Sequence, residues 1–195
     1  MSGGNNPMIT GRGGDHGRGA ITGGVSRGRR CHDHAVSTVT LRPMTEAEFA
    51  QFRQATARAF ADELVATSGW SPEEALERAL QGSAELLPQG TATPGMLLFT
   101  ALRDDGTPVG RLWLGLTHPR GVPDCAFVYD IEVAEAHRGG GLGRALLAAG
   151  EDVVRGHGVA AVELNVFGDN ARAIGLYRSS GYRVVSQQMR KDLTA

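Results

Sequence analysis

A glycine-rich turn carries the clearest chemical signal in this sequence. It follows an apolar run and leads directly into residues with helical apolar spacing, and it consists of Arg138, Gly139, Gly140, Gly141, Leu142 and Gly143. Glycines leave the backbone N–H groups bare, and the positive end of a helix dipole favours negative charge. The turn therefore predicts a binding site for a phosphorylated ligand.

The glycine spacing excludes two common nucleotide loops. A dinucleotide fingerprint that starts at Gly141 needs glycine or alanine where Leu146 stands, and one that starts at Gly139 needs it where Arg144 stands. A Walker-type loop needs a lysine directly after its last glycine, and the only lysine in the chain is Lys191. The remaining pattern is R-x-x-G-x-G.

The size and composition of the chain indicate one soluble domain. The chain has 195 residues, 41% apolar content and a formal net charge of −1, so it has no global attraction to nucleic acid or anionic lipid. No apolar run approaches the roughly 18 residues of a membrane helix, and no signal peptide is recognisable. We expect a cytoplasmic protein with no nucleic-acid or membrane partner.

The first half of the chain predicts a strand, two helices and a hairpin. The strand ends at Arg42-Pro43, and capping boxes at Thr45/Glu48 and Ser71/Glu74 begin the helices. The second helix should extend to about residue 86 or 87. The hairpin pairs residues 96–102 with 109–116 around an Asp-Gly turn.

The second half alternates strands with helices. A strand over 125–133 leads to the glycine turn and a helix that Gly156 and Gly158 should end. A strand over 160–166, a helix capped by Asp169 or Asn170, and a closing strand from Tyr182 to Leu193 follow. The predicted order is β-α-α-β-β-β-α-β-α-β.

Residues 1–37 predict a disordered tail. Ten of the first thirty residues are glycine, and five arginines against two aspartates give the tail a net charge of +3. A non-functional extension is the favoured interpretation, over weak contact with RNA. Metal binding by Cys31, His32 and His34 is disfavoured because their spacing matches no recognised zinc site, so no metal is expected. Cys31 and Cys125 are a poor basis for a disulfide.

Two blocks resemble the GNAT family of N-acetyltransferases. The first combines Asp130-Ile131-Glu132-Val133 with Arg138, Gly141 and Gly143 of the loop. The second runs from Glu163 to Asn170 and on through Tyr177 to Gly181-Tyr182. The resemblance implies an α/β (α+β) fold over residues 38–195, with a mixed, mostly antiparallel sheet of about six to seven strands flanked by about four helices.

The resemblance also implies roles for individual residues. Tyr177 matches the family's tyrosine near the thioester sulfur and is expected to act as general acid; the alternative is a core aromatic. The residues expected to bind acetyl-CoA are Ile131, Val133, Arg138, Gly139, Gly140, Gly141, Leu142, Gly143, Arg144, Asn165 and Asn170. A capping role for Asn170 is compatible with this.

The general base is predicted to be Glu132, which lies next to Val133 on the strand that is expected to border the cofactor. A partly buried carboxylate could accept the proton of the amine directly or through water. Strand alternation leaves an alternative open, in which Glu132 points to the opposite face and is an ordinary structural carboxylate. Asp62, Glu63, His118 and Tyr129 are further residues that could line the acceptor side.

The predicted activity is acetyl-CoA-dependent N-acetylation of a primary amine, on a small molecule. Acetylation of a protein or peptide is the alternative within the same chemistry, although Phe127 and Asn165 depart from relatives that acetylate protein N-termini. A non-catalytic acyl-CoA-binding module is the alternative from another class. The expected partners are acetyl-CoA and an amine acceptor, and a homodimer is possible.

Overall fold

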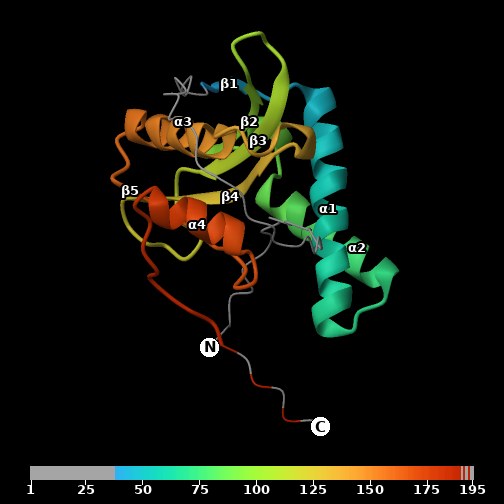
Figure 1. Ribbon diagram of the computed structural model, residues 1–195. Coiled ribbons are helices and arrows are strands. Elements are labelled where there is room, and N and C mark those ends of the chain that lie inside the picture. Colours follow the sequence, from blue (N-terminus) through green and yellow to red (C-terminus); the bar gives the residue numbers. More distant parts are fainter. Residues whose placement is uncertain (1–37, 190, 192, 194–195) are drawn as a thin grey trace, which may run out of the picture.

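The computed structural model describes residues 38–189, 191 and 193 of the chain (Figure 1). At its centre is one sheet with the strand order β1 (Thr40–Pro43), β2 (Met96–Leu102), β3 (Pro108–Gly115), β4 (Cys125–Val133) and β5 (Ala161–Leu164). The neighbours β1 to β4 pair antiparallel, and β4 pairs parallel with β5. The helices are α1 (Glu46–Ser68), α2 (Pro72–Leu86), α3 (Leu142–Gly156) and α4 (Ala171–Ser179).

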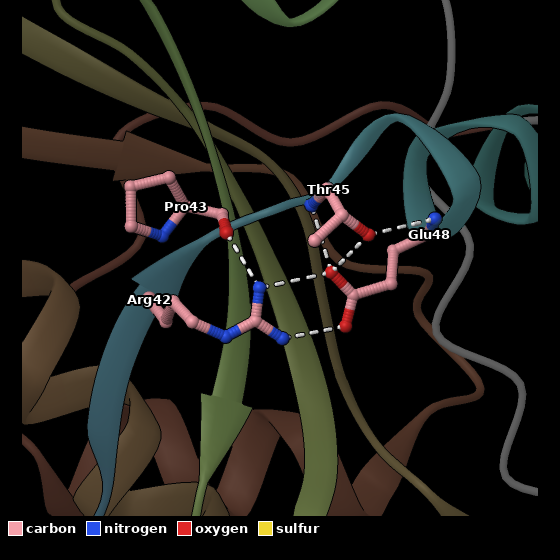
Figure 2. A network of polar contacts seen from close by, with 4 residues as sticks. All are labelled: Arg42, Pro43, Thr45 and Glu48. Carbon is pink, nitrogen blue, oxygen red and sulfur yellow. Dashed lines mark hydrogen bonds and ion pairs between the residues drawn. The ribbon is translucent and has the colours of Figure 1, made fainter.

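The predicted capping box begins α1 and joins it to β1 (Figure 2). The Thr45 hydroxyl accepts the N–H of Glu48, and the N–H of Thr45 donates to the Glu48 carboxylate at 2.8 Å. Arg42 on β1 donates to both oxygens of Glu48, at 2.7 and 3.1 Å, and to the carbonyl of Pro43 at 2.9 Å. These contacts fix the direction in which the chain leaves the sheet.

The other predicted elements of the first half are confirmed. Ser71 caps α2 with Pro72 at the first helical position and Glu74 closing the box. Strands β2 and β3 form the predicted hairpin, and Gly106 in its turn has φ of 80°. Such a positive φ favours glycine, which explains the Asp-Gly step.

The two faces of the sheet carry separate apolar cores. Helices α1 and α2 pack on the face that bears Trp113 together with other aromatic side chains. Helix α3 packs on the face that bears Leu112. Trp113 and Leu112 are neighbours on β3 and point to opposite faces, as strand alternation requires. An added Cβ at Gly150 of α3 would lie 2.7 Å from Leu112, so this glycine lets the helix approach the sheet closely.

Two details of the predicted fold are wrong. The sheet described here has five strands instead of six to seven, and the described residues between Tyr182 and Leu193 form no strand. Val184, Val185 and Met189 in this segment are exposed, at 65%, 54% and 86%. The apolar pattern gave the segment strand propensity, but a strand also needs a neighbouring edge to pair with.

The predicted tail, with Cys31, His32 and His34, lies outside the described residues, and its disorder stays a prediction. Cys125 is buried and free, as expected for a residue inside a strand. Within the described part of the chain, no helix is long and apolar enough to cross a membrane.

Candidate active site

The sheet opens between β4 and β5. The two strands pair only from Cys125 with Ala161 to Val128 with Leu164. Leu164 ends β5, whereas β4 continues to Val133. The last part of β4, residues 129–133, therefore extends beyond its pairing with β5.

The backbone of this part of β4 faces the opening at Ile131 and Val133. The N–H of Ala134 donates to the Val109 carbonyl on β3 at 2.8 Å. Successive residues of a strand direct their peptide groups to opposite edges, so the groups of Ile131 and Val133 face away from β3. This direction suits an extended ligand that hydrogen-bonds to β4 as an added strand would.

A β-bulge in β4 decides where its carboxylates point. Trp113 pairs with Asp130 and Leu114 with Val128, so Tyr129 is the additional residue. The bulge shifts the alternation, and Asp130 and Glu132 consequently share the α1–α2 face. On that face lies Arg111, whose guanidinium sits 5.5 Å from the centre of the Phe52 ring of α1. Regular alternation would have turned both carboxylates toward α3.

The glycine loop has the geometry of an anion site. Gly139 and Gly141 have φ of 97° and 80°, which a residue with a side chain rarely adopts. Gly141 caps α3 without a side-chain hydrogen bond, and the first turn of this helix contains no acidic residue. The N–H groups at the start of α3 and the positive end of its dipole thus meet no competing carboxylate from that turn. The loop glycines 139–141 are exposed and accessible to a ligand.

Four charged side chains connect the α1–α2 face of β4 with this loop. Arg111 donates through Nε to Asp130 at 2.7 Å and through Nη2 to Glu132 at 2.6 Å. Glu132 also lies 3.6 Å from Nη2 of Arg138, whose Nε donates to the Val133 carbonyl at 3.1 Å. Burial disfavours the charged form of Arg111, but Asp130 and Glu132 outweigh it and raise the pKa of its guanidinium.

Tyr177 lies on α4, half-buried, with its ring 5.7 Å from that of Tyr182. Burial raises the pKa of Tyr177 to about 12, and the negative charge of Asp130 adds to the shift. The phenol therefore keeps its proton at neutral pH, as a general acid requires.

Helix α4 is capped at its N-terminus and joined to α3 at its C-terminus. Asn170 caps it by accepting the N–H of Ala173 at 3.0 Å, which confirms the predicted cap. Arg144 of α3 donates to the carbonyl and hydroxyl of Ser179, at 3.1 and 2.7 Å, and to the hydroxyl of Ser180 at 3.3 Å. The Arg144 guanidinium, expected to bind the cofactor, thus contacts the end of the helix that carries Tyr177.

A second polar cluster fastens the segment after β3 to β5. His118 is buried and its Nε2 lies 3.0 Å from the Glu163 carboxylate, while its Nδ1 accepts the N–H of Arg120. Because Nδ1 is an acceptor, the proton of a neutral ring is on Nε2 and is donated to Glu163. His118 also stacks edge-on against Phe127, so it packs inside the protein.

Sequence reasoning gave no role to Arg111, placed Asp130 only within the family block, and missed the bulge. A lone arginine within the apolar run of β3 and two alternating carboxylates on β4 were the available signals, but nothing in the sequence showed the bulge that brings them together. Asn165 directly follows β5, beside the opening where its cofactor contact is predicted. Among the described residues, no cluster of three His, Cys, Asp or Glu could hold a metal ion.

Comparison with known proteins identifies the family to which this chain is similar. Residues 54–182 match the model of the acetyltransferase (GNAT) family. The chain is 32% identical over 154 residues to the N-acetyltransferase YdgE of Bacillus subtilis, covering 79% of this chain and 98% of that protein. The crystal structure of the acetyltransferase YycN from Bacillus subtilis matches with a TM-score of 0.73 and 32% identity, over 81% of this chain and 100% of that chain.

A further match covers only part of this chain and part of a longer protein. Over 95 residues the chain is 40% identical to the mycothiol acetyltransferase of Beutenbergia cavernae, a stretch that covers 48% of this chain and 30% of that protein. The family match spans more than half of the chain, and YdgE and YycN align over nearly their whole length. The chain therefore belongs to the GNAT family and is an acetyltransferase enzyme.

Proposed function

We propose that this enzyme transfers the acetyl group of acetyl-CoA to a primary amine of a small molecule, with Tyr177 as the general acid. The observation that carries the proposal is the parting of β4 and β5 after Val128, on the strand that leads to the glycine loop at the start of α3. An extended ligand with a phosphate group at one end matches both features. Acetyl-CoA, which the family uses, has this shape and charge.

The residues fit acetyl-CoA in their chemistry. In the proposal, the backbone N–H groups of the loop, Gly139 to Gly143 and Arg144, hold the diphosphate at the positive end of α3. The peptide groups of Ile131 and the N–H of Val133 hydrogen-bond the pantetheine arm along the edge of β4, since the Val133 carbonyl already accepts from Arg138. Asn165 and Asn170 complete the other side of the opening. The bound thioester supplies an activated acetyl group.

Tyr177 supplies the proton that the departing sulfur needs. Its raised pKa of about 12 keeps the phenol protonated, and α4 is fastened to α3 through Arg144, so the hydroxyl has a fixed position relative to the loop. General acid catalysis of this kind contributes roughly a hundredfold or more to a rate.

Glu132 remains the predicted proton acceptor for the amine. The bulge turns it to the α1–α2 face, where the acceptor is expected, which favours a role in the site over the opposite orientation. Both of its oxygens, however, already face guanidinium groups, from Arg111 and Arg138. Proton acceptance would therefore have to displace one of these contacts.

The proposed acceptor is a small-molecule amine and not a protein N-terminus. The similarity to a mycothiol acetyltransferase supports a small molecule, and the departures at Phe127 and Asn165 speak against a protein N-terminus. A direct test is thiol release from acetyl-CoA with a panel of mycothiol-related amines, polyamines, aminoglycosides, amino acids and peptides. Mass spectrometry of the product identifies the acceptor, and a peptide product would overturn the small-molecule assignment.

The general acid is tested by Tyr177→Phe with Tyr182→Phe as the matched control. We expect Tyr177→Phe to lower kcat about a hundredfold while the Kd for coenzyme A measured by calorimetry stays unchanged. Tyr182→Phe removes the hydroxyl of the neighbouring ring and should leave kcat within about threefold. Equal rates for wild type and Tyr177→Phe would disprove the assignment. Binding of coenzyme A without turnover of any amine would favour the non-catalytic module.

A further inference from the structure

We propose that Arg138 acts as a positioning residue, which braces the glycine loop against β4 through Glu132 and Val133, and that its guanidinium is not a phosphate ligand. The inference rests on the proposed function, because it takes the loop to bind the diphosphate of coenzyme A. It also assigns Glu132 a role that needs no proton transfer.

The contacts of Arg138 point back to the strand. Its Nε donates to the Val133 carbonyl at 3.1 Å, and its Nη2 forms an ion pair with Glu132 at 3.6 Å. Two of the three guanidinium nitrogens are thus directed to acceptors on the end of β4. The planar, forked shape of arginine allows it to reach a carbonyl and a carboxylate at once, which a lysine could not do in the same way.

Glu132 is itself held from the other side. Oε2 of Glu132 lies 2.6 Å from Nη2 of Arg111, while Oε1 faces Arg138. Arg111 is in turn anchored on Asp130, whose side chain is only 1% exposed. Charges therefore alternate along the row Asp130, Arg111, Glu132 and Arg138, and the row extends from the buried sheet to the first residue of the loop.

The brace acts at the start of the loop, because Leu142 at the other end is already buried in the core, at 2% exposure. Gly139, Gly140 and Gly141 have no side chains with which to pack, and glycine loses more conformational freedom on ordering than any other residue. Fixing the residue directly before them reduces the range of conformations the loop samples. A ligand that binds the ordered loop then pays less entropy on binding.

The brace predicts an effect on affinity, which calorimetry with coenzyme A measures without any acceptor. We expect Glu132→Gln to raise the Kd about threefold and Arg138→Gln to raise it about tenfold, with circular dichroism unchanged. Arg42→Gln is the matched control, because Arg42 forms a similar pair with Glu48 at the start of α1. Its Kd should equal that of the wild type.

The double variant Glu132→Gln/Arg138→Gln separates a brace from a phosphate ligand. If the two side chains act as one unit, the double variant binds no more weakly than Arg138→Gln alone. If Arg138 contacts the diphosphate independently, the two effects multiply to about thirtyfold, and the proposal is overturned. Unchanged Kd values in both single variants would overturn it as well.

Kinetics distinguish the brace from a catalytic base. With an acceptor in hand, the brace predicts that Glu132→Gln and Arg138→Gln both raise KM for acetyl-CoA, whatever Glu132→Gln does to kcat. A loss of kcat and of the acidic limb in Glu132→Gln with no rise in KM in either variant would overturn the brace and leave Glu132 as the base alone. Wild-type protein that fails to bind coenzyme A would defeat the proposed function itself, an outcome distinct from variants that bind as tightly as wild type.

Discussion

At the scale of single residues, the site depends on how burial and charge act on the same group. Asp130 is buried and pairs with Arg111, yet its negative charge still reaches Tyr177 and disfavours the phenolate. Burial acts in the same direction, so both effects keep the phenol protonated. The same carboxylate thus anchors the row of charges toward the loop and acts on the phenol that is proposed as the general acid.

This double role predicts a measurable shift in Asp130→Asn. Removing the negative charge should lower the pKa of Tyr177 from about 12, while burial keeps it above the ordinary value of 10.0. Phenolate absorbance followed during an alkaline titration measures the shift. The chain has three tyrosines, so the difference between Asp130→Asn and Asp130→Asn/Tyr177→Phe isolates the signal. An unchanged or higher pKa would show that the charge of Asp130 does not act on the phenol.

At the scale of elements, the two capping boxes differ in the partners of their glutamates. Glu48 and Glu74 both close a box, but only Glu48 is also hydrogen-bonded by an arginine. The Arg42 hydrogen bond is the main reason that the pKa of Glu48 falls from 4.5 to about 2, with Thr45 adding to it against the effect of burial. A lowered pKa means that the charged carboxylate stabilises the folded state.

We expect Glu48→Gln to lower the free energy of unfolding by about 0.5–1 kcal/mol at pH 7. Glutamine keeps the capping box and loses the ion pair, so Glu74→Gln is the control and should lose less. Because the folded pKa is depressed, the contribution of Glu48 is present above pH 4.5 and is lost as the pH falls toward about 2. Urea denaturation at several pH values checks this, and a difference that persists undiminished at pH 2 would contradict the linkage.

Helix α4 depends on Arg144 for its position. The sequence resemblance made Arg144 a cofactor ligand, whereas its guanidinium contacts Ser179 and Ser180, just beyond Tyr177. We expect Arg144→Gln to lower kcat about threefold to tenfold through the displaced phenol, with the Kd for coenzyme A within about twofold. Arg178→Gln, an exposed change on the same helix, is the control. A weakened Kd with unchanged kcat would restore the ligand role.

At the scale of the whole molecule, the sequence predicted elements better than their relations. Local signals such as the Thr45 and Ser71 caps and the glycine turn act within a few residues, and the structure confirms each of them. The prediction of a closing strand was wrong because a strand must pair with an edge that is distant in the sequence. The bulge at Tyr129 could not be predicted either, since it is a mismatch between two strands, and it determines the face on which Asp130 and Glu132 lie.

The limits of the domain give the last prediction. Thr38 donates its hydroxyl to Asp104 at 2.6 and 2.7 Å, next to the pairing of β1 with β2, so Thr38 already contacts the folded part of the chain. A protein of residues 38–195 should unfold within about 2 °C of the full chain and bind coenzyme A with a Kd within about twofold. Thermal unfolding and calorimetry on both proteins measure this. A substantial loss in either would mean that residues 1–37, with their net charge of +3, contribute to the fold or to the site.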